Sequence, residues 1–332
     1  MANSTTQTTQ PEKKAASAAS IAFAFACVYF FWGSTYTAIR IGTVYMPANL
    51  LSGIRFLIAG ALLLAWCRMR GLRLLWPLRT MSMLGLIGFF LLSVSNVCLV
   101  YAEKTVPSGL ASLVLAVTPL LIALAEMLLP GGEPIPARGW LGIALGFVGL
   151  GAVLWPSLLT GLAGDRVRFV AIGVLLTGAM VWVTGSLVSR HARLPVNSFV
   201  AAAWQMIFAG AFSLALGTAL GQWPNFHVNA ASVGSLAWLV TGGSLVGYSA
   251  FIYLLEHVPV AKVSSYAYVN PVVAVFLGIL LLHERPEAAE YAGMVGIVVA
   301  VFLMSTAKVK SKDSTQPTEP QSTGDLEPPL AE

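Results

Sequence analysis

Charged residues are scarce in this chain. Of its 332 residues only 10% are Asp, Glu, Lys or Arg, while 57% are hydrophobic. An ordinary soluble domain has about 25% charged residues. A soluble protein of this length has too small an interior to hide so much apolar surface. The composition therefore argues against a soluble globular domain and indicates a protein whose outer surface meets lipid.

Residues that carry out hydrolytic chemistry are also few. The four histidines and three aspartates fall in loops or at the ends of apolar segments, at His191, His227, His257, His283, Asp165, Asp313 and Asp325. Neither an HExxH zinc motif nor a Walker A phosphate loop is present. An intramembrane enzyme and an ATP-driven pump are therefore disfavoured, and we expect no cofactor and no metal.

Cysteine is almost absent. Cys27, Cys67 and Cys98 lie in or beside three different apolar segments and show no paired spacing. Such a pattern supports neither a disulfide framework nor a zinc site. We expect these three side chains to be small residues in helix contacts.

Long apolar windows recur along the chain. A helix needs about 20 apolar residues to cross a bilayer, and a membrane barrel would show alternating polarity in short segments. The windows lack that alternation, so the sequence predicts an all-α polytopic membrane protein with ten transmembrane helices. The ten windows are 18–42, 47–69, 80–101, 107–129, 136–155, 169–190, 195–221, 231–256, 259–282 and 287–306.

Two pairs of prolines reveal an internal repeat. One shift along the chain places Pro107 on Pro259 and Pro119 on Pro271, and a similar shift places Arg55 on Gln205. Each half then has five helices, and because five is odd the halves enter the membrane from opposite sides. Inverted repeats of this kind are typical of secondary transporters, whose substrate site lies near the bilayer midplane between the halves.

The repeat also divides the chain. We expect a first five-helix repeat at 18–155 and a second at 169–306, with disordered tails at 1–17 and 307–332, which are polar and contain proline. Most basic residues outside the apolar windows fall on the side of the two termini. Because Lys and Arg are enriched in cytoplasmic loops, both termini are expected in the cytoplasm. Nucleic-acid binding is not needed to explain the basic balance.

The stretch SYAYVNPVVAV, residues 265–275, places polar groups and a helix breaker inside an apolar window. Tyr266 and Asn270 share a helical face, and Pro271 frees the carbonyl four residues before it. Thr118 and Pro119 stand at the equivalent place in the first half. Interrupted helices in matching positions point to a transport site with hinges at the two prolines. Plain helix packing is the alternative.

Arg55 is the costliest residue in the chain. It lies eight residues into the second window, where insertion of arginine costs about 2.5–3.5 kcal/mol. Its repeat partner Gln205 is polar at a similar depth. Arg55 can receive a carboxylate or phosphate, or it can hold the fold through backbone carbonyls or an acidic side chain. Glu126, near the end of the fourth window, is a candidate proton relay, although interfacial solvation also explains it.

Several aromatic residues lie deep in the windows. Trp32, Trp182 and Tyr248 fall far from the expected interfaces. Aromatic walls suit a cavity for an amphipathic or cationic organic molecule, and helix packing explains each residue equally well.

The motifs together resemble a known family. WGSTYTAIRIG (32–42), GIRFLIAG (53–60), VPSG (106–109), Thr118-Pro119 and SYAYVNPVVAV look like the EamA branch of the drug/metabolite transporter superfamily, and within it the YedA-type permeases. The resemblance covers nearly all of residues 20–306. It implies a ten-helix inner-membrane carrier that exports amino acids or other small metabolites by alternating access. It further implies a central cavity lined by Trp32, Ser34, Asn96, Thr118, Trp182, Tyr248, Tyr266 and Asn270.

We therefore expect a secondary transporter that exports a small organic solute, such as an amino acid, a related metabolite or a drug-like amphiphile. Facilitated diffusion without proton coupling is the alternative mechanism. The expected partners are the solute and the lipid bilayer. The sequence is also compatible with a homodimer. The candidate site combines the eight cavity residues with Arg55, Gln205, the hinges Pro119 and Pro271, and the relay candidate Glu126.

Overall fold

The computed structural model describes residues 17–129, 135–162, 166–192, 194–258, 263, 266–286 and 288–306. Every regular element in these ranges is helical, so the predicted all-α fold is confirmed. The tails expected to be disordered lie outside the described residues, apart from Ser17.

Prolines begin several helices of the first half. Pro47, Pro77 and Pro107 stand directly before α3, α4 and α6. An amide at the start of a helix has no intrahelical acceptor, so proline loses nothing there. The elements are α1 Ala18–Cys27, η1 Val28–Trp32, α2 Gly33–Thr43, α3 Ala48–Met69, α4 Leu78–Gly88, η2 Phe89–Val94, α5 Ser95–Ala102, α6 Ser108–Leu115, α7 Thr118–Leu128 and α8 Ala137–Leu162.

Asparagines cap helices of the second half. The side chain of Asn197 accepts from the Phe199 amide, and Asn229 forms a reciprocal capping box with Ser232. The elements are α9 Arg166–Ala192, α10 Ser198–Ala219, η3 Trp223–Asn225, α11 Ala230–Trp238, η4 Leu239–Gly247, α12 Tyr248–His257, α14 Tyr266–Leu282 and α15 Ala288–Thr306. Gly71 after α3 and Gly221 after α10 both adopt positive φ, 70° and 64°, a conformation that favours glycine.

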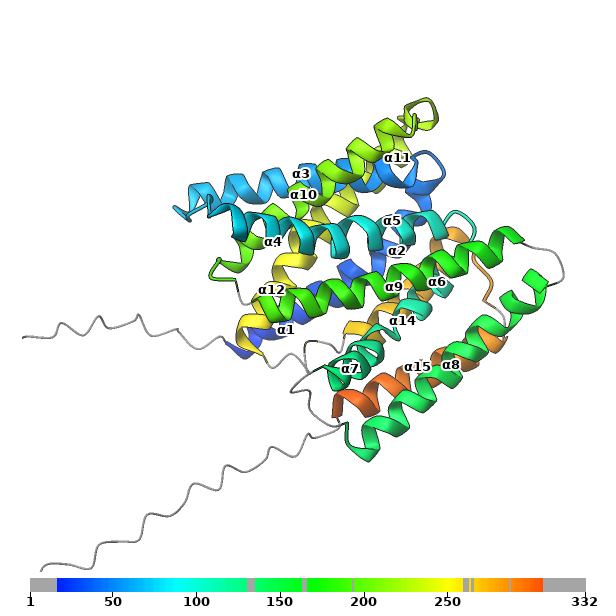
Figure 1. Cartoon of the computed structure of the whole chain (residues 1–332). Coiled ribbons are helices and arrows are strands. Elements are labelled where there is room, and N and C mark those ends of the chain that lie inside the picture. The colour runs from blue at the N-terminus through cyan, green and yellow to red at the C-terminus, as the bar shows by residue number, and fades with distance from the viewer. Residues whose placement is uncertain are drawn as a thin grey trace, which may run out of the picture.

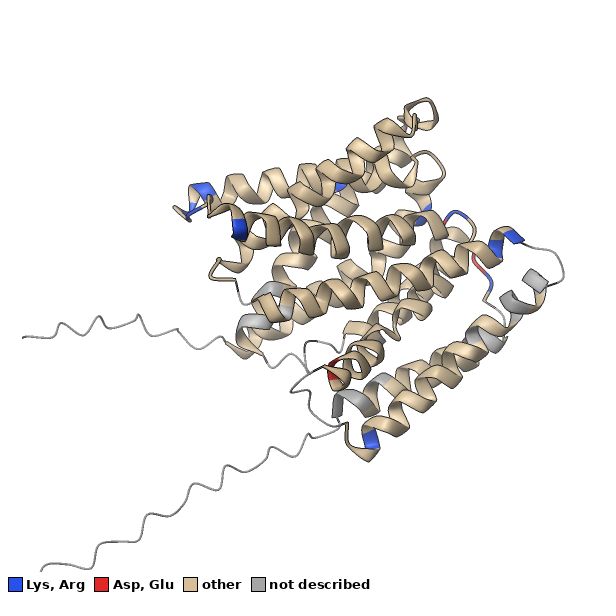
Figure 2. Cartoon of the chain, viewed as in Figure 1, with Lys and Arg blue, Asp and Glu red and all other residues tan. Residues whose placement is uncertain are grey.

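The helices are long and apolar enough for a polytopic membrane protein. In the described part of the chain, seven stretches meet that requirement. They are Ala18–Thr43, Ala48–Met69, Leu78–Ala102, Ser108–Leu128, Arg166–Ser189, Ser198–Ala219 and Ala230–Phe251. Three shorter apolar helices are Ala137–Ala152, Val269–Leu282 and Tyr291–Ala300. The number of ten spans therefore stays a prediction. Charged residues lie mainly at the two ends of the helix bundle (Figure 2).

Helices from the two halves pack against each other in pairs. α3 lies along α10, and α8 lies along α15 (Figure 1). α2 contacts α11 and α14, while α9 contacts α5 and α7. α14 also packs against α6. Each half thus covers apolar faces of the other rather than folding as a separate body.

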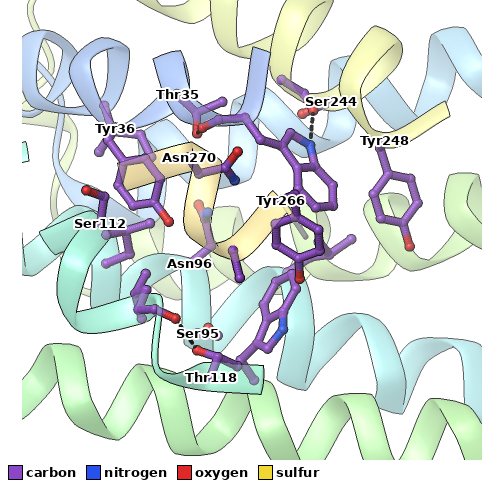
Figure 3. Close-up of a pocket in the computed structure, with 18 of the residues that line it drawn as sticks. Thr35, Tyr36, Ser95, Asn96, Ser112, Thr118, Ser244, Tyr248, Tyr266 and Asn270 are labelled. Atoms are coloured by element: carbon purple, nitrogen blue, oxygen red, sulfur yellow. Dashed lines mark hydrogen bonds between the residues drawn. The ribbon is translucent and has the colours of Figure 1, made fainter. Parts of the chain in front are cut away.

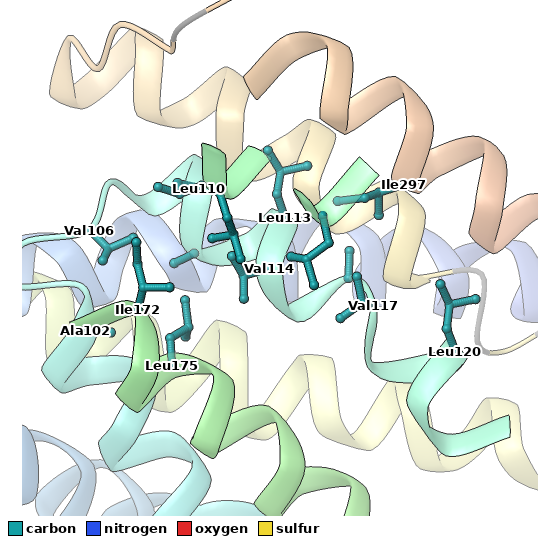
Figure 4. Packing of buried hydrophobic residues seen from close by; sticks show 14 of the residues in the cluster. Ala102, Val106, Leu110, Leu113, Val114, Val117, Leu120, Ile172, Leu175 and Ile297 are labelled. Carbon is teal, nitrogen blue, oxygen red and sulfur yellow. The ribbon is translucent and has the colours of Figure 1, made fainter. Parts of the chain in front are cut away.

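The largest buried cluster joins α6, α7, α9 and α15 (Figure 4). Leu113, Leu120, Leu175 and Ile297 are almost fully buried within it. Because lipid is as apolar as leucine, tight packing rather than escape from water stabilises such helix contacts. Close packing of this kind holds the fourth, sixth and tenth predicted spans together and so supports one wall of the cavity described next.

Three stretches of π-helix interrupt the α-helices. η1 lies between α1 and α2, η2 between α4 and α5, and η4 between α11 and α12. A π turn carries one extra residue, which shifts the side chains that follow to a different face. Such turns are frequent at functional sites, and all three elements or their neighbours contribute to a central cavity.

Candidate functional site

A cavity of about 150 Å³ lies between the two halves. A protein cavity of about this volume can hold a molecule the size of benzene. Its walls come from η1, α2, α3, η2, α5, α6 and α7 of the first half and from α9, α10, η4, α12 and α14 of the second (Figure 3). The space is large enough for a small organic solute.

Most of the residues singled out from the sequence line this one cavity. Ten of the thirteen do so, namely Trp32, Arg55, Asn96, Thr118, Pro119, Trp182, Tyr248, Tyr266, Asn270 and Pro271. The remaining three, Ser34, Gln205 and Glu126, are not among the lining residues.

Ser34 and Gln205 lie behind the wall, so their assignment to the lining is corrected. The Ser34 hydroxyl donates to the Phe31 carbonyl at 2.9 Å and accepts from the Trp238 indole at 2.9 Å. Gln205 Oε1 accepts from the Tyr248 hydroxyl at 3.2 Å. Both side chains are therefore occupied in holding helices together. Glu126 lies half-buried on α7, away from the cavity.

Arg55 brings a formal positive charge into the lining. Its side chain is 6% exposed, and its guanidinium lies over the Phe56 ring, 4.8 Å from the centroid. Nε donates to the Ser244 hydroxyl at 3.0 Å. No Asp or Glu is found among the lining residues that the structure describes. The described lining is therefore positively charged.

Two amides add hydrogen-bonding capacity. Asn96 on α5 and Asn270 on α14 both point into the middle of the cavity in Figure 3. Asn96 Oδ1 accepts from the Ser52 hydroxyl at 3.0 Å. Asn270 is 5% exposed, and its Oδ1 has no donor among the described residues. A buried acceptor without a partner costs about 1–3 kcal/mol, so a hydrogen-bond donor on a ligand would be stabilised there.

Aromatic rings form another part of the wall. The Trp32 ring centroid lies 5.0 Å from that of Tyr266, edge to face, and 4.9 Å from that of Phe251. Tyr248 packs on the same ring at 6.4 Å. The Trp32 indole donates to the Gly243 carbonyl at 3.1 Å, so the ring is held in place. This wall suits the apolar part of a solute.

The two prolines behave differently. The helix of the fourth predicted span is broken at the expected place, because α6 ends at Leu115 and α7 begins at Thr118, directly before Pro119. The Leu115 carbonyl, which Pro119 frees, accepts from the Thr118 hydroxyl at 2.6 Å.

Pro271, in contrast, lies inside the continuous helix α14. The break expected at Pro271 is thus corrected: one missing hydrogen bond does not interrupt a helix that packs closely against α2 and α6.

Sequence reasoning missed five polar lining residues, Thr35, Tyr36, Ser95, Ser112 and Ser244. Thr35 and Tyr36 lie three and four residues after Trp32, a spacing that places them on the same face of a helix as Trp32. Nothing in the sequence marked Ser244. Among the described residues, no three His, Cys, Asp or Glu side chains gather in a way that could hold a metal ion.

Comparison with known proteins identifies the family of the chain. The profile of the EamA-like transporter family matches residues 19–155 and again residues 169–306. The chain belongs to the EamA-like transporter family. It is 35% identical over 282 residues to "Uncharacterized inner membrane transporter YedA" of Escherichia coli (strain K12), covering 85% of this chain and 89% of that protein.

More distant relatives match over similar lengths. The chain is 26% identical over 302 residues to "Uncharacterized transporter YvbV" of Bacillus subtilis (strain 168), covering 88% of this chain and 93% of that protein. A solved crystal structure superposes with a TM-score of 0.62 at 24% identity, covering 86% of this chain and 97% of that one. That likeness supports the fold alone.

Proposed function

We propose that this EamA-family transporter is a secondary carrier that exports a small organic solute bearing a carboxylate across the inner membrane. Amino acids and related metabolites are the solutes we expect. The observation that carries the proposal is Arg55, buried in the central cavity with no acidic residue in the described lining. The name of the Escherichia coli relative, an inner membrane transporter, supports the location.

Electrostatics favours an anionic or zwitterionic solute. A buried guanidinium is costly unless it is paired, and charge-assisted hydrogen bonds to a carboxylate are roughly twice as strong as neutral ones. Nε of Arg55 donates to the Ser244 hydroxyl, and the other guanidinium N–H groups would bind the carboxylate of the solute. A purely cationic drug would meet like charge at low dielectric. The aromatic wall around Trp32 and the Asn270 amide would receive the rest of an amino acid.

The pairing of helices supports an inverted repeat of ten spans. Exchanging the halves maps the contact between α2 and α14 onto that between α9 and α7. The same exchange maps the contact of α2 with α11 onto that of α9 with α4, while α3 with α10 and α8 with α15 map onto themselves. Carriers with such repeats open a shared cavity to each side in turn. The helix break at Pro119 and the missing hydrogen bond at Pro271 are our proposed points of bending.

An inside location of both termini, with the repeats at 18–155 and 169–306, completes the proposal. The protein then acts without cofactor and is not an enzyme, and its partners are the solute and the bilayer. Facilitated diffusion without proton coupling would use the same cavity. Dimerisation is not required, because helices of one chain enclose the site.

The test is a transport assay with purified protein in liposomes. The liposomes are loaded with a pool of the twenty standard amino acids and polar metabolites, and loss of each is followed by mass spectrometry. We expect selective loss of carboxylate solutes that depends on the protein. Arg55→Gln should weaken the apparent affinity for those solutes by about 10- to 100-fold, as a hydrogen bond to a charged group contributes about 1.5–3 kcal/mol.

Arg55→Lys separates the two roles of the residue. Lysine keeps the charge but not the fork that binds a carboxylate through two hydrogen bonds, so its affinity should fall between those of wild type and Arg55→Gln. Normal transport by a folded Arg55→Gln protein would reject Arg55 as the anion receptor. Loss of folding in Arg55→Gln together with wild-type affinity in Arg55→Lys would assign Arg55 to the fold.

A further inference from the structure

Glu103 is a buried acid that the sequence did not single out. It follows α5 directly, and its side chain is 0% exposed. Neither carboxylate oxygen has a hydrogen-bond donor within the described part of the chain. The Glu103 backbone carbonyl, in contrast, accepts a hydrogen bond from the guanidinium of Arg40 on α2. The cation that would neutralise the acid is thus directed to the main chain beside it.

The groups around Glu103 come from three neighbouring segments. α2 supplies Arg40 and Tyr36, α3 supplies Arg55, and the segment after α14 supplies Glu284. The Glu284 carboxylate is already used at the start of α6. It accepts from the Ser108 amide at 2.8 Å, the Ser108 hydroxyl at 2.9 Å and the Gly109 amide at 3.3 Å. Glu284 therefore adds negative charge near Glu103 and cannot donate to it.

The environment favours the neutral form of the acid. An ionised carboxylate without donors costs several kcal/mol more in a buried site than the neutral acid does. Burial accordingly raises the pKa of Glu103 well above its usual range. The Arg40 guanidinium lowers that pKa, Glu284 raises it, and Arg55 lowers it. Burial is the largest of these effects, so the surroundings of Glu103 favour the protonated carboxyl.

Glu103 also lies close to the solute cavity. Tyr36 and Arg55 are electrostatic neighbours of Glu103, and both line that cavity. Tyr36 and Arg40 are four residues apart and share a face of α2. α5 ends and α6 begins at the end of the molecule opposite to the start of α1 (Figure 1). Glu103 thus lies toward that end of the molecule, one helical turn beyond Leu99, which lines the cavity.

We propose that Glu103 is the proton-binding group of the transport cycle. In the described conformation it carries a proton, and Arg40 binds the main-chain carbonyl. When α2 shifts, the Arg40 guanidinium moves to the carboxyl, the O–H bond breaks, the proton passes to water, and a Glu103–Arg40 ion pair forms. Uptake of a proton reverses the step. One proton is then exchanged in each cycle, against the exported solute.

This inference rests on the proposed transport function and replaces Glu126 as the relay. Glu126 lies half-buried on α7, near the end of the fourth predicted span that is farther from Glu103. Glu126→Gln therefore makes a matched control. Glutamine imitates a protonated glutamate in shape, so Glu103→Gln is expected to fold. Glu103→Asp provides a second variant that can still bind a proton.

The first experiment follows protons and solutes together. Liposomes containing the full chain and a trapped pH-sensitive dye are loaded with the twenty standard amino acids, and solute loss is measured by mass spectrometry. A pH difference of one unit can drive about a tenfold concentration ratio when one proton is exchanged. We expect that ratio for wild type and Glu126→Gln, a ratio near one for Glu103→Gln, and partial recovery in Glu103→Asp.

The second experiment needs no transport. Infrared spectroscopy detects the C=O stretch that only a protonated carboxyl gives, and we expect this band at pH 7 in wild type and Glu126→Gln but not in Glu103→Gln. Gradient-driven transport that survives in Glu103→Gln, or is lost instead in Glu126→Gln, would overturn the inference. Solute loss in wild type that ignores the pH gradient would also overturn it and leave the transport function standing. If no amino acid moves, the proposed substrate class fails, and absence of the infrared band would then reject Glu103 separately.

Discussion

Arg55 Nε on α3 donates a hydrogen bond of 3.0 Å to the Ser244 hydroxyl in the π-helix η4. The bond joins the two halves of the chain across the cavity that both residues line. It also fixes one edge of a guanidinium that lines the site. Ser244 is thus a positioning residue for the charge that we propose as the solute anchor.

Ser244→Ala should weaken solute binding without abolishing transport. Loss of a hydrogen bond to a charged group costs about 1.5–3 kcal/mol, and ~1.4 kcal/mol corresponds to tenfold in affinity. We expect an apparent affinity for carboxylate solutes about tenfold lower, at an unchanged maximal rate, in concentration-dependent liposome assays. Ser213→Ala is the control, because its hydroxyl bonds to Ser93 at 2.6 Å outside the cavity lining. Equal affinities for the two variants would contradict the positioning role.

Gly33 sets the distance between α2 and α14. A Cβ atom at Gly33 would lie 2.6 Å from Val273 Cβ and 3.2 Å from the Asn270 carbonyl oxygen. Gly33→Ala should therefore push the helices apart at a cost of about 1–3 kcal/mol. We expect a lower thermal midpoint in detergent and weaker transport, since Asn270 lines the cavity.

Gly173→Ala on α9 is the matched control for Gly33. A Cβ there meets no atom within 4 Å, and alanine favours a helix over glycine by up to about 1 kcal/mol. Its thermal midpoint should be unchanged or slightly higher. Similar midpoints for the two alanine variants would show that the close approach at Gly33 does not limit stability.

The helical fold could be predicted from the sequence because it depends mainly on where long apolar segments occur. Apolar windows are read directly from residue type, and Pro47, Pro77 and Pro107 mark where helices begin. The broken helix before Pro119 was also predictable, whereas the continuous helix through Pro271 was not. Whether a proline interrupts a helix depends on the neighbouring helices, and these are not visible in a single segment.

Facing directions were harder to predict than depth. Ser34 and Gln205 lie at cavity depth, yet both point to other helices. A π turn rotates the residues that follow it relative to a regular 3.6-residue period, and η1 ends directly before Gly33. Glu103 was missed for another reason: residues at the end of an apolar window are usually solvated, whereas this one is fully buried beside Arg40, Arg55 and Glu284.

Asn270→Leu tests whether the cavity or helix packing explains the polar face of α14. Leucine fills a similar volume but cannot accept a hydrogen bond, and Asn270 Oδ1 has no donor in the described part of the chain. Removing such an acceptor should cost little stability. We therefore expect a folded protein with a near-wild-type thermal midpoint whose liposome transport of carboxylate solutes falls at least about tenfold, the equivalent of ~1.4 kcal/mol of lost binding.

Asn49→Leu is the matched control for Asn270→Leu. Asn49 is 7% exposed against 5% for Asn270, and its Oδ1 likewise has no donor among the residues described. It lies in the first turn of α3, outside the cavity lining, so the same substitution there should leave transport intact. Loss of transport in both variants would trace the effect to burying leucine in the bundle. A lower thermal midpoint for Asn270→Leu alone would assign Asn270 to helix packing. A side chain that contacts only the solute does not stabilise the protein in the absence of solute.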